Sequence, residues 1–207
     1  GRVVALSPDR DELIVGCKNV VIRVYSFNDR TNEIQYQLMF RKSNEEISDI
    51  KMTPGTLVIG SHDNWIYVYD YEAGKIKERF ATLKKHSSYI THMDISRDGA
   101  NLHSTCGAYE LLFWDLNSGK QLAGGTTMLR NEHWATWTTT LGWPVQGIWP
   151  KCADGTFYNA VDRSHFTLNG KTFKDDALGL HLLATGNDLG KVNIFHYPCL
   201  EKGALSV

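Results

Sequence analysis

The chain has 207 residues, with 22 basic and 23 acidic side chains and a formal net charge of −1. This balance argues against a nucleic-acid-binding surface of the usual basic kind. No apolar run reaches the length of a membrane span. The four cysteines are scattered without a Cys-x-x-Cys pair, which favours reduced thiols in an intracellular protein.

One eleven-residue pattern occurs four times along the chain. Each copy opens on a small residue, continues through a polar turn and ends in an alternating strand with an aromatic residue at its tenth position. The copies begin at Gly16, Gly60, Thr105 and Gly186, and their aromatic residues are Tyr25, Tyr69, Trp114 and Phe195. Alternating β-branched and aromatic residues between turn formers are typical of a half-buried strand.

Further apolar segments surround each copy of the pattern. We expect innermost strands at 3–6, 47–52, 90–95 and 159–161, second strands at 13–15, 57–59, 102–104 and 182–184, and outer strands at 34–40 and 76–83. Pro or Gly in the connecting segments supplies turn chemistry. Each repeat therefore predicts a small antiparallel sheet.

The spacing of the repeats indicates the fold. The four aromatic residues are 44, 45 and 81 positions apart, and Trp114 is followed by Asp115. A period of about 40–45 residues with several short strands and a closing Trp-Asp is typical of a WD-repeat β-propeller. We predict an all-β, WD40-type β-propeller of about four four-stranded antiparallel blades. The predicted blades are residues 1–33, 34–75, 76–119 and 120–198, with 199–207 beginning a further blade outside this sequence.

The fourth repeat is longer than the others, and the excess falls in two places. One is the stretch between Asp115 and Ser164, which holds four of the six tryptophans within 131–155. We predict an added hairpin there, with strands at 136–140 and 145–149. Its tryptophans, Trp143 among them, could dock a partner or form an apolar plug, and we favour the plug. The other is a surface insertion at 166–178.

His86 precedes the third innermost strand, where WD repeats carry a Gly-His pair that bonds the turn aspartate of its blade. The aspartate position holds Ala108 here, so the network would be broken, or rebuilt by Tyr109 or Glu110. We expect a buried His86 that is satisfied by backbone groups. The residues that we assign to structural repeat positions are Tyr25, Asp63, Tyr69, Asp70, His86, Trp114, Asp115, Asp188 and Phe195.

The later repeats resemble the echinoderm microtubule-associated-protein-like family. The matching segments are Trp134–Thr138, Gly147–Pro150, Asp154–Thr156, Asn159–His165, Leu182–Asn193 and Tyr197–Cys199, with weaker matches at Phe113–Leu116 and Gly119–Lys120. The resemblance implies the second of two tandem atypical propellers in a cytoskeletal protein that associates with microtubules and tubulin. It also implies that a separate N-terminal region carries much of the attachment. The insertion at 166–178 departs from the family pattern and suggests a divergent, protist or axonemal member.

The sequence offers no catalytic or metal site. Protease, hydrolase, P-loop and EF-hand spacings are all missing. His92 and His103 fall on neighbouring predicted strands and could approach each other, but neither has a Cys or carboxylate at ligand spacing. We therefore predict no enzyme activity, no cofactor and no small-molecule substrate.

The predicted function is a non-catalytic scaffold for protein partners, tubulin or axonemal and other cytoskeletal proteins, in the cytoplasm, on microtubules or in the cilium. Loops of a propeller supply contacts while its strands fix their geometry. The candidate contacts are Arg41, Lys42, Lys84, Lys85, Lys171 and Lys174, together with Trp143. An alternative is an adaptor in a signalling or ubiquitin-ligase complex that docks through the tryptophan-rich segment. No nucleic acid or membrane partner is expected.

Overall fold

The computed structural model describes residues 1–8, 11–28, 30–31, 33–41, 43–72, 75–152, 157–164, 167–168, 171–172 and 181–207. The chain divides into two compact units, Gly1–Ala135 and Thr136–Val207. No helix among the described residues combines the length and the apolar character needed to cross a membrane.

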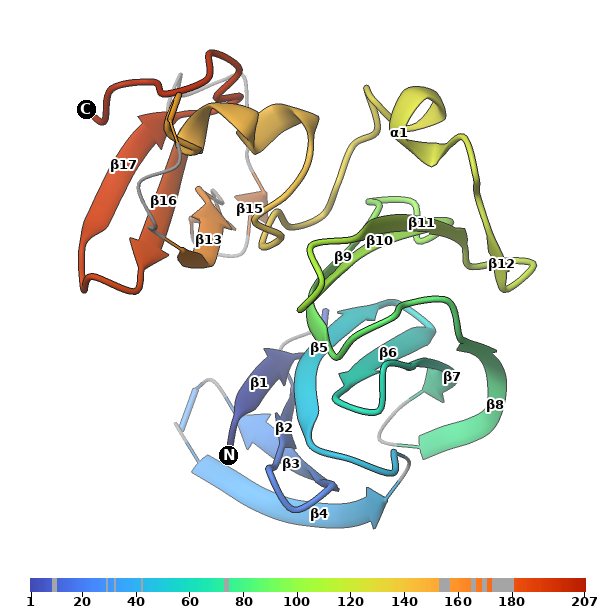
Figure 1. The fold of residues 1–207 in the computed structure, drawn as a ribbon. Coiled ribbons are helices and arrows are strands. Elements are labelled where there is room, and N and C mark those ends of the chain that lie inside the picture. The colour runs from blue at the N-terminus through green and yellow to red at the C-terminus, as the bar shows by residue number, and fades with distance from the viewer. Residues whose placement is uncertain are drawn as a thin grey trace. The chain divides into compact units, whose positions relative to one another are not determined.

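The first unit contains three antiparallel sheets of four strands each, and the strands of each sheet follow in chain order (Figure 1). The first sheet consists of β1 (Val3–Leu6), β2 (Glu12–Gly16), β3 (Val21–Asn28) and β4 (Glu33–Arg41). The second consists of β5 (Ile47–Thr53), β6 (Thr56–Ser61), β7 (Ile66–Glu72) and β8 (Lys75–Leu83). The third consists of β9 (Ile90–Ile95), β10 (Asn101–Cys106), β11 (Leu111–Asp115) and β12 (Lys120–Gln121), and the short helix α1 (Gly125–Met128) follows it.

The second unit contains one three-stranded antiparallel sheet in the order β13–β16–β17. Its strands are β13 (Tyr158–Arg163), β16 (Leu182–Asn187) and β17 (Val192–His196). A separate two-stranded ribbon joins β14 (Thr167–Leu168) to β15 (Lys171–Thr172) within the predicted insertion. A 3₁₀ helix, η1, covers Trp143–Ile148.

The four repeat aromatics occupy equivalent positions in their sheets. Each lies on the third strand of its sheet, directly opposite a leucine of the second strand. The pairs are Tyr25 with Leu13, Tyr69 with Leu57, Trp114 with Leu102 and Phe195 with Leu183. This shared register confirms the predicted WD40-type propeller sheets.

Alternation along the strands of the second sheet builds the core on both of its faces. Leu57 and Tyr69 join the buried cluster shared with the first sheet. Val58 and Val68 join the cluster shared with the third sheet. Because successive side chains of a strand point to opposite faces, the middle sheet of the unit is apolar on both sides. Neighbouring sheets therefore stabilise one another, as repeat architectures require.

The turn in each repeat has the same backbone conformation. The fifth position of the pattern has positive φ in every copy: Val20 (69°), Asn64 (69°), Tyr109 (59°) and Gly190 (71°). Glycine and asparagine tolerate this left-handed region, whereas a β-branched residue is strained there. Val20 is therefore the strained member of the set.

Replacing Val20 with asparagine is expected to raise the free energy of unfolding by about 1 kcal/mol, because it relieves that strain. Denaturant titration followed by circular dichroism measures the change. The matched reverse substitution, Asn64→Val, places a β-branched residue at the equivalent turn and is expected to lower stability by a similar amount. A Val20→Asn variant no more stable than the parent would contradict the assignment of strain.

The sheets are offset by one strand from the predicted blades. The predicted second blade includes the segment 34–40, but this segment forms β4, which pairs with β3 in the first sheet. The predicted third blade likewise includes 76–83, but this segment forms β8, which pairs with β7 in the second sheet. Short connections favour pairing with the preceding strand, so each outer strand closes the sheet before it. The segment 199–207 contains no strand. Its backbone instead bonds to η1, with Gly147 N–H donating to the Cys199 carbonyl at 2.8 Å.

The predicted hairpin at 136–140 and 145–149 is wrong. The first segment is irregular, and the second is the 3₁₀ helix η1. Pro144 at the helix start presets a helical φ, and the buried Val145 and Ile148 are three residues apart, which places them on one face of a 3₁₀ helix. Trp137 is buried and donates its indole N–H to the Thr139 carbonyl.

Candidate interaction face and the network beneath it

Lys84 is held in place by an aromatic ring. It follows β8, is exposed, and lies with its Nζ 3.6 Å from the centroid of the Trp65 ring. Trp65 sits in the turn between β6 and β7, and its ring packs edge-on to Tyr67. A cation over an aromatic face is attracted by the ring quadrupole, so the ammonium group is positioned rather than freely mobile.

Further aromatic residues stand in the connections between strands of the second and third sheets. Tyr89, 45% exposed, packs its ring 4.8 Å from that of His62. Tyr109, 54% exposed, stands in the turn between β10 and β11. Gly107 N–H of the same turn donates to the Tyr89 carbonyl, which joins the turn to the segment 84–89. The group that we call the loop face consists of His62, Trp65, Lys84, Lys85, Tyr89 and Tyr109.

The structure places Arg41 and Trp143 among the other predicted contacts and leaves the rest partly or wholly undescribed. Arg41 is exposed at the end of β4 in the first sheet. Lys42 and Lys174 lie outside the described residues, and of Lys171 only its backbone place in β15 is described. Trp143 is partly buried in η1 of the second unit. Lys84 and Lys85 are the two candidates that stand in the loop face as defined above.

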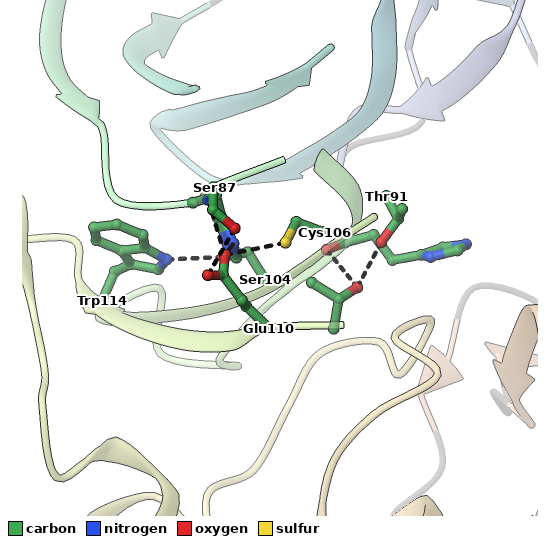
Figure 2. Close-up of polar contacts among 9 residues, drawn as sticks. Ser87, Thr91, Ser104, Cys106, Glu110 and Trp114 are labelled. Carbon is green, nitrogen blue, oxygen red and sulfur yellow. Dashed lines mark hydrogen bonds and ion pairs between the residues drawn. The ribbon is translucent and has the colours of Figure 1, made fainter. Parts of the chain in front are cut away.

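His86 forms a hydrogen-bond network with side chains of the third repeat, and Figure 2 labels Ser104, Glu110 and Trp114 of this network. Its Nε2 lies 2.7 Å from Ser104 Oγ, which also accepts the indole N–H of Trp114 at 2.8 Å. Its Nδ1 lies 3.3 Å from a carboxylate oxygen of Glu110. The network is thus rebuilt by Glu110, one of the two residues that the sequence offered. The expectation that backbone groups satisfy His86 was wrong, because these partners are side chains.

Glu110 fixes the segment 84–89 to the turn. Its carboxylate accepts the backbone N–H of Ser87 at 2.9 Å, the Ser87 hydroxyl at 2.8 Å and the Cys106 thiol at 3.2 Å. These hydrogen bonds, led by the Ser87 backbone and followed by the Cys106 thiol, lower the pKa of Glu110 to about 2. The carboxylate is therefore charged at neutral pH.

Two other repeats use an aspartate in the same way. Asp63 accepts the backbone N–H of Asn44, and Asp188 accepts that of Phe157, each at 3.1 Å. In every case an acid in the turn holds the segment that leads into the innermost strand. The third repeat uses Glu110 for this role, two positions later than Asp63 stands in its own repeat, and the longer side chain makes up the difference.

Removing this carboxylate is expected to change acid stability. Because its folded pKa lies below the unfolded value, its contribution is complete above about pH 4.5 and is lost as pH falls toward 2. Glu110→Gln should cost about 1–2 kcal/mol at pH 7, less than a fully buried charged bond since the side chain is 34% exposed. Unfolding titrations at several pH values measure both effects. Glu45→Gln, at an exposed site, is the control, and an unchanged acid limb in Glu110→Gln would contradict the assignment.

The Cys106, His86 and Glu110 set is not an activated nucleophile. Burial raises the pKa of the Cys106 thiol, and burial also lowers the pKa of His86, which favours a neutral imidazole. The thiol bonds the carboxylate rather than a basic ring nitrogen. A reactive cysteine needs a lowered pKa and an adjacent base, so this arrangement supports structure rather than covalent chemistry.

A second polar pair in the third sheet escaped the sequence interpretation. His103 Nε2 lies 2.9 Å from Asp94 Oδ2, and both side chains are fully buried. The His103 ring stacks on Trp134 with centroids 4.0 Å apart and planes at 12°. His92 lies opposite Thr105 and His103 opposite Asp94 in the register, so the two histidines are diagonal neighbours on adjacent strands. The tight turn after β9, which sets Asp94 opposite His103, is the signal that could have revealed the pair.

A buried carboxylate also links two sheets. Asp49 of β5 accepts the backbone N–H of Met93 in β9 at 2.7 Å. Burial raises the pKa of Asp49, while Lys51 at 3.2 Å opposes that shift. This bond connects the innermost strands of the second and third sheets directly.

Comparison with known proteins identifies relatives. The family model described as the echinoderm microtubule-associated protein second beta-propeller matches residues 1–207. Echinoderm microtubule-associated protein-like 2 of Mus musculus is 43% identical over 166 residues, which cover 79% of this chain and 23% of that protein. The 77 kDa echinoderm microtubule-associated protein of Lytechinus variegatus is 43% identical over 143 residues, covering 69% and 19%. The chain thus spans less than a quarter of the length of these curated relatives.

Solved structures support the fold. A chain in the crystal structure of the mitotic checkpoint complex superposes with a TM-score of 0.51 at 18% identity, covering 93% of this chain and 46% of that one. The computationally designed Ika4 protein gives a TM-score of 0.50 at 15% identity, covering 94% and 89%. The family match and the sequence identities carry the assignment: the chain belongs to the family of second β-propellers of echinoderm microtubule-associated proteins.

Proposed function

We propose that this chain is a non-catalytic scaffold whose loop face binds an acidic segment of a cytoskeletal protein, with tubulin in microtubules as the leading partner, in the cytoplasm. The observation that carries the proposal is the exposed Lys84, which is held over the Trp65 ring, with the exposed Lys85 next to it in the chain. The names of the relatives describe whole proteins associated with microtubules. Tubulin is acidic, so charge complementarity favours this face.

The loop face suits a local contact rather than long-range attraction. The formal net charge of the chain is −1, so the whole protein supplies no strong electrostatic steering. Tyrosine and tryptophan are enriched where a few residues carry most of the binding energy. A lysine held on a ring loses less conformational freedom on binding than a mobile one. We therefore expect a modest affinity that weakens with added salt.

Co-sedimentation of the chain with microtubules tests the proposal. Lys84→Glu/Lys85→Glu should weaken binding by about 10-fold or more. Lys75→Glu/Lys120→Glu makes the same charge change at the opposite ends of the second and third sheets and should leave binding within about 2-fold. Equal pelleting of both double variants and the parent would overturn the assignment of the face.

A further inference from the structure

We propose that His86, Cys106 and Glu110 form a binding site for a divalent transition-metal ion, with Zn²⁺ as the best match. One ligand atom from each of these side chains lies within 4.8 Å of the other two. Glu110 Oε2 is 3.3 Å from His86 Nδ1 and 3.2 Å from Cys106 Sγ. Ligand atoms around a tetrahedral zinc ion are separated by about 3.3–3.6 Å, so the edge from Glu110 to His86 already has the required length and the edge from Glu110 to Cys106 needs to lengthen by about 0.4 Å.

Three separate backbone elements bring these donors together. His86 stands in the segment before β9, Cys106 ends β10, and Glu110 follows the turn between β10 and β11. The pairing of β10 with β9 shifts between Thr105 and Cys106, and such bulges re-aim side chains. The left-handed Tyr109 then directs the chain into Glu110. The third edge, from the His86 ring to the Cys106 thiol, is at most 4.8 Å long, so closing it requires a movement of at most about 1.5 Å.

The protons balance on the chain's own residues. Zinc replaces the thiol proton of Cys106, which leaves to solvent, and the carboxylate of Glu110 is already charged. In the metal-free network the Glu110 carboxylate can only accept, so Nδ1 of His86 carries the imidazole proton. On binding, Nδ1 offers its lone pair to the ion and the proton moves to Nε2, which donates to Ser104 Oγ at 2.7 Å. An outer hydrogen bond of this kind fixes the tautomer of a metal-bound histidine. Ser104 is held in turn by the indole N–H of Trp114, as Figure 2 shows.

The donor set selects the metal. Thiolate and imidazole favour zinc and related ions, whereas magnesium and calcium prefer oxygen ligands. His86 and Cys106 are buried, but the Glu110 side chain is 34% exposed and Ser87 beside it is exposed. The ion would enter from that side and keep a water molecule in the fourth position, as in open three-ligand sites.

Cys17 provides an internal comparison. It stands at the same position of the first repeat as Cys106 does in the third, and it is also buried. Its thiol lies 4.0 Å from the Val15 carbonyl, and among the described residues no three-donor group includes it. The repeat itself therefore does not create the site. His86 and Glu110 create it in one copy only.

Titration of the full chain with Zn²⁺ against a chromogenic chelator tests the proposal. We expect one tight site, release of about one proton per ion, and a thiolate charge-transfer band when Co²⁺ replaces zinc. Cys106→Ser should weaken zinc binding by about 10–100-fold or more, since even loss of an outer partner costs that much. Cys17→Ser is the matched control and should bind as the parent does. Circular dichroism of both variants confirms that each is folded.

Two results would overturn the site. One is equal zinc affinity in the parent and Cys106→Ser. The other is a Co²⁺ spectrum without a thiolate band. If Cys106→Ser loses structure, Glu110→Gln supplies the second test, because it keeps the thiol and the histidine but removes the charged ligand. Unchanged zinc affinity and proton release in Glu110→Gln would likewise contradict the proposal.

Discussion

Replacing Asp94 with alanine is expected to lower the free energy of unfolding by about 3–5 kcal/mol. Asp94 and His103 form a hydrogen-bonded pair without solvent exposure, and the His103 ring is clamped against Trp134. Removing the carboxylate leaves the imidazole buried without its acceptor. The cost of a pair broken on one side exceeds the net stabilisation that the intact pair provides.

A double substitution separates the cost of breaking the pair on one side from the net stabilisation that the intact pair provides. Asp94→Leu/His103→Leu removes both polar groups and should be less destabilising than Asp94→Ala, because neither member of the pair is left buried without the other. Asp70→Ala removes an exposed carboxylate of the second sheet and should change stability by no more than about 0.5 kcal/mol. Urea titration followed by circular dichroism measures all three. A loss below about 1 kcal/mol for Asp94→Ala would contradict the energetic role of the pair.

The repeat pattern predicted most of the strands because the strands obey local rules. Alternation at Leu57 to Ile59 and Ile66 to Tyr69 reflects two faces buried in different clusters. The turns carry Gly, Asn or Pro where the backbone needs them. Because the pattern occurs four times, a residue that departs from it in one copy can be recognised as an exception by comparison with the others. Most strands and the equivalent places of the repeat aromatics could therefore be predicted without coordinates, whereas the outer strands were placed in the wrong sheets.

The tryptophan-rich segment could not be predicted in the same way. Apolar residues at 145 and 148 and a proline at 144 suit a short buried strand as well as a 3₁₀ turn, and short apolar runs are ambiguous by periodicity alone. The deciding contact comes from far along the chain. A Cβ at Gly147 would lie 2.7 Å from Cys199 Sγ, so the close approach of the 199–207 segment to the backbone selects the compact helix.

The candidate site, too, could be predicted only in part from the sequence. The sequence named His86 and offered Glu110 as a replacement acid, since both lie where the repeat needs them. It did not reveal the lysine–tryptophan contact, because Lys84 and Trp65 belong to different connections of the second sheet. Contacts between turns depend on side-chain reach, which the repeat pattern does not contain.

Replacing Trp114 with alanine is the second large expected effect, a loss of about 3–5 kcal/mol. Its side chain is 2% exposed and belongs to the apolar cluster between the second and third sheets. The substitution removes buried apolar surface and leaves a cavity, and both contributions lower stability. It also removes the indole N–H that Ser104 Oγ accepts, which weakens the hold on His86.

Tyr25 gives a matched control at the equivalent position of the first repeat. It is partly exposed and packs edge-on against Tyr36, which is itself 57% exposed. Because Tyr25 buries less apolar surface than Trp114 does, Tyr25→Ala should lower the free energy of unfolding by only about 1–2 kcal/mol. Trp114→Phe keeps a large ring but removes the N–H donor. Its loss of stability should lie between those of Trp114→Ala and Tyr25→Ala. Equal losses for Trp114→Ala and Tyr25→Ala would show that burial between neighbouring sheets does not set the stability of these repeats.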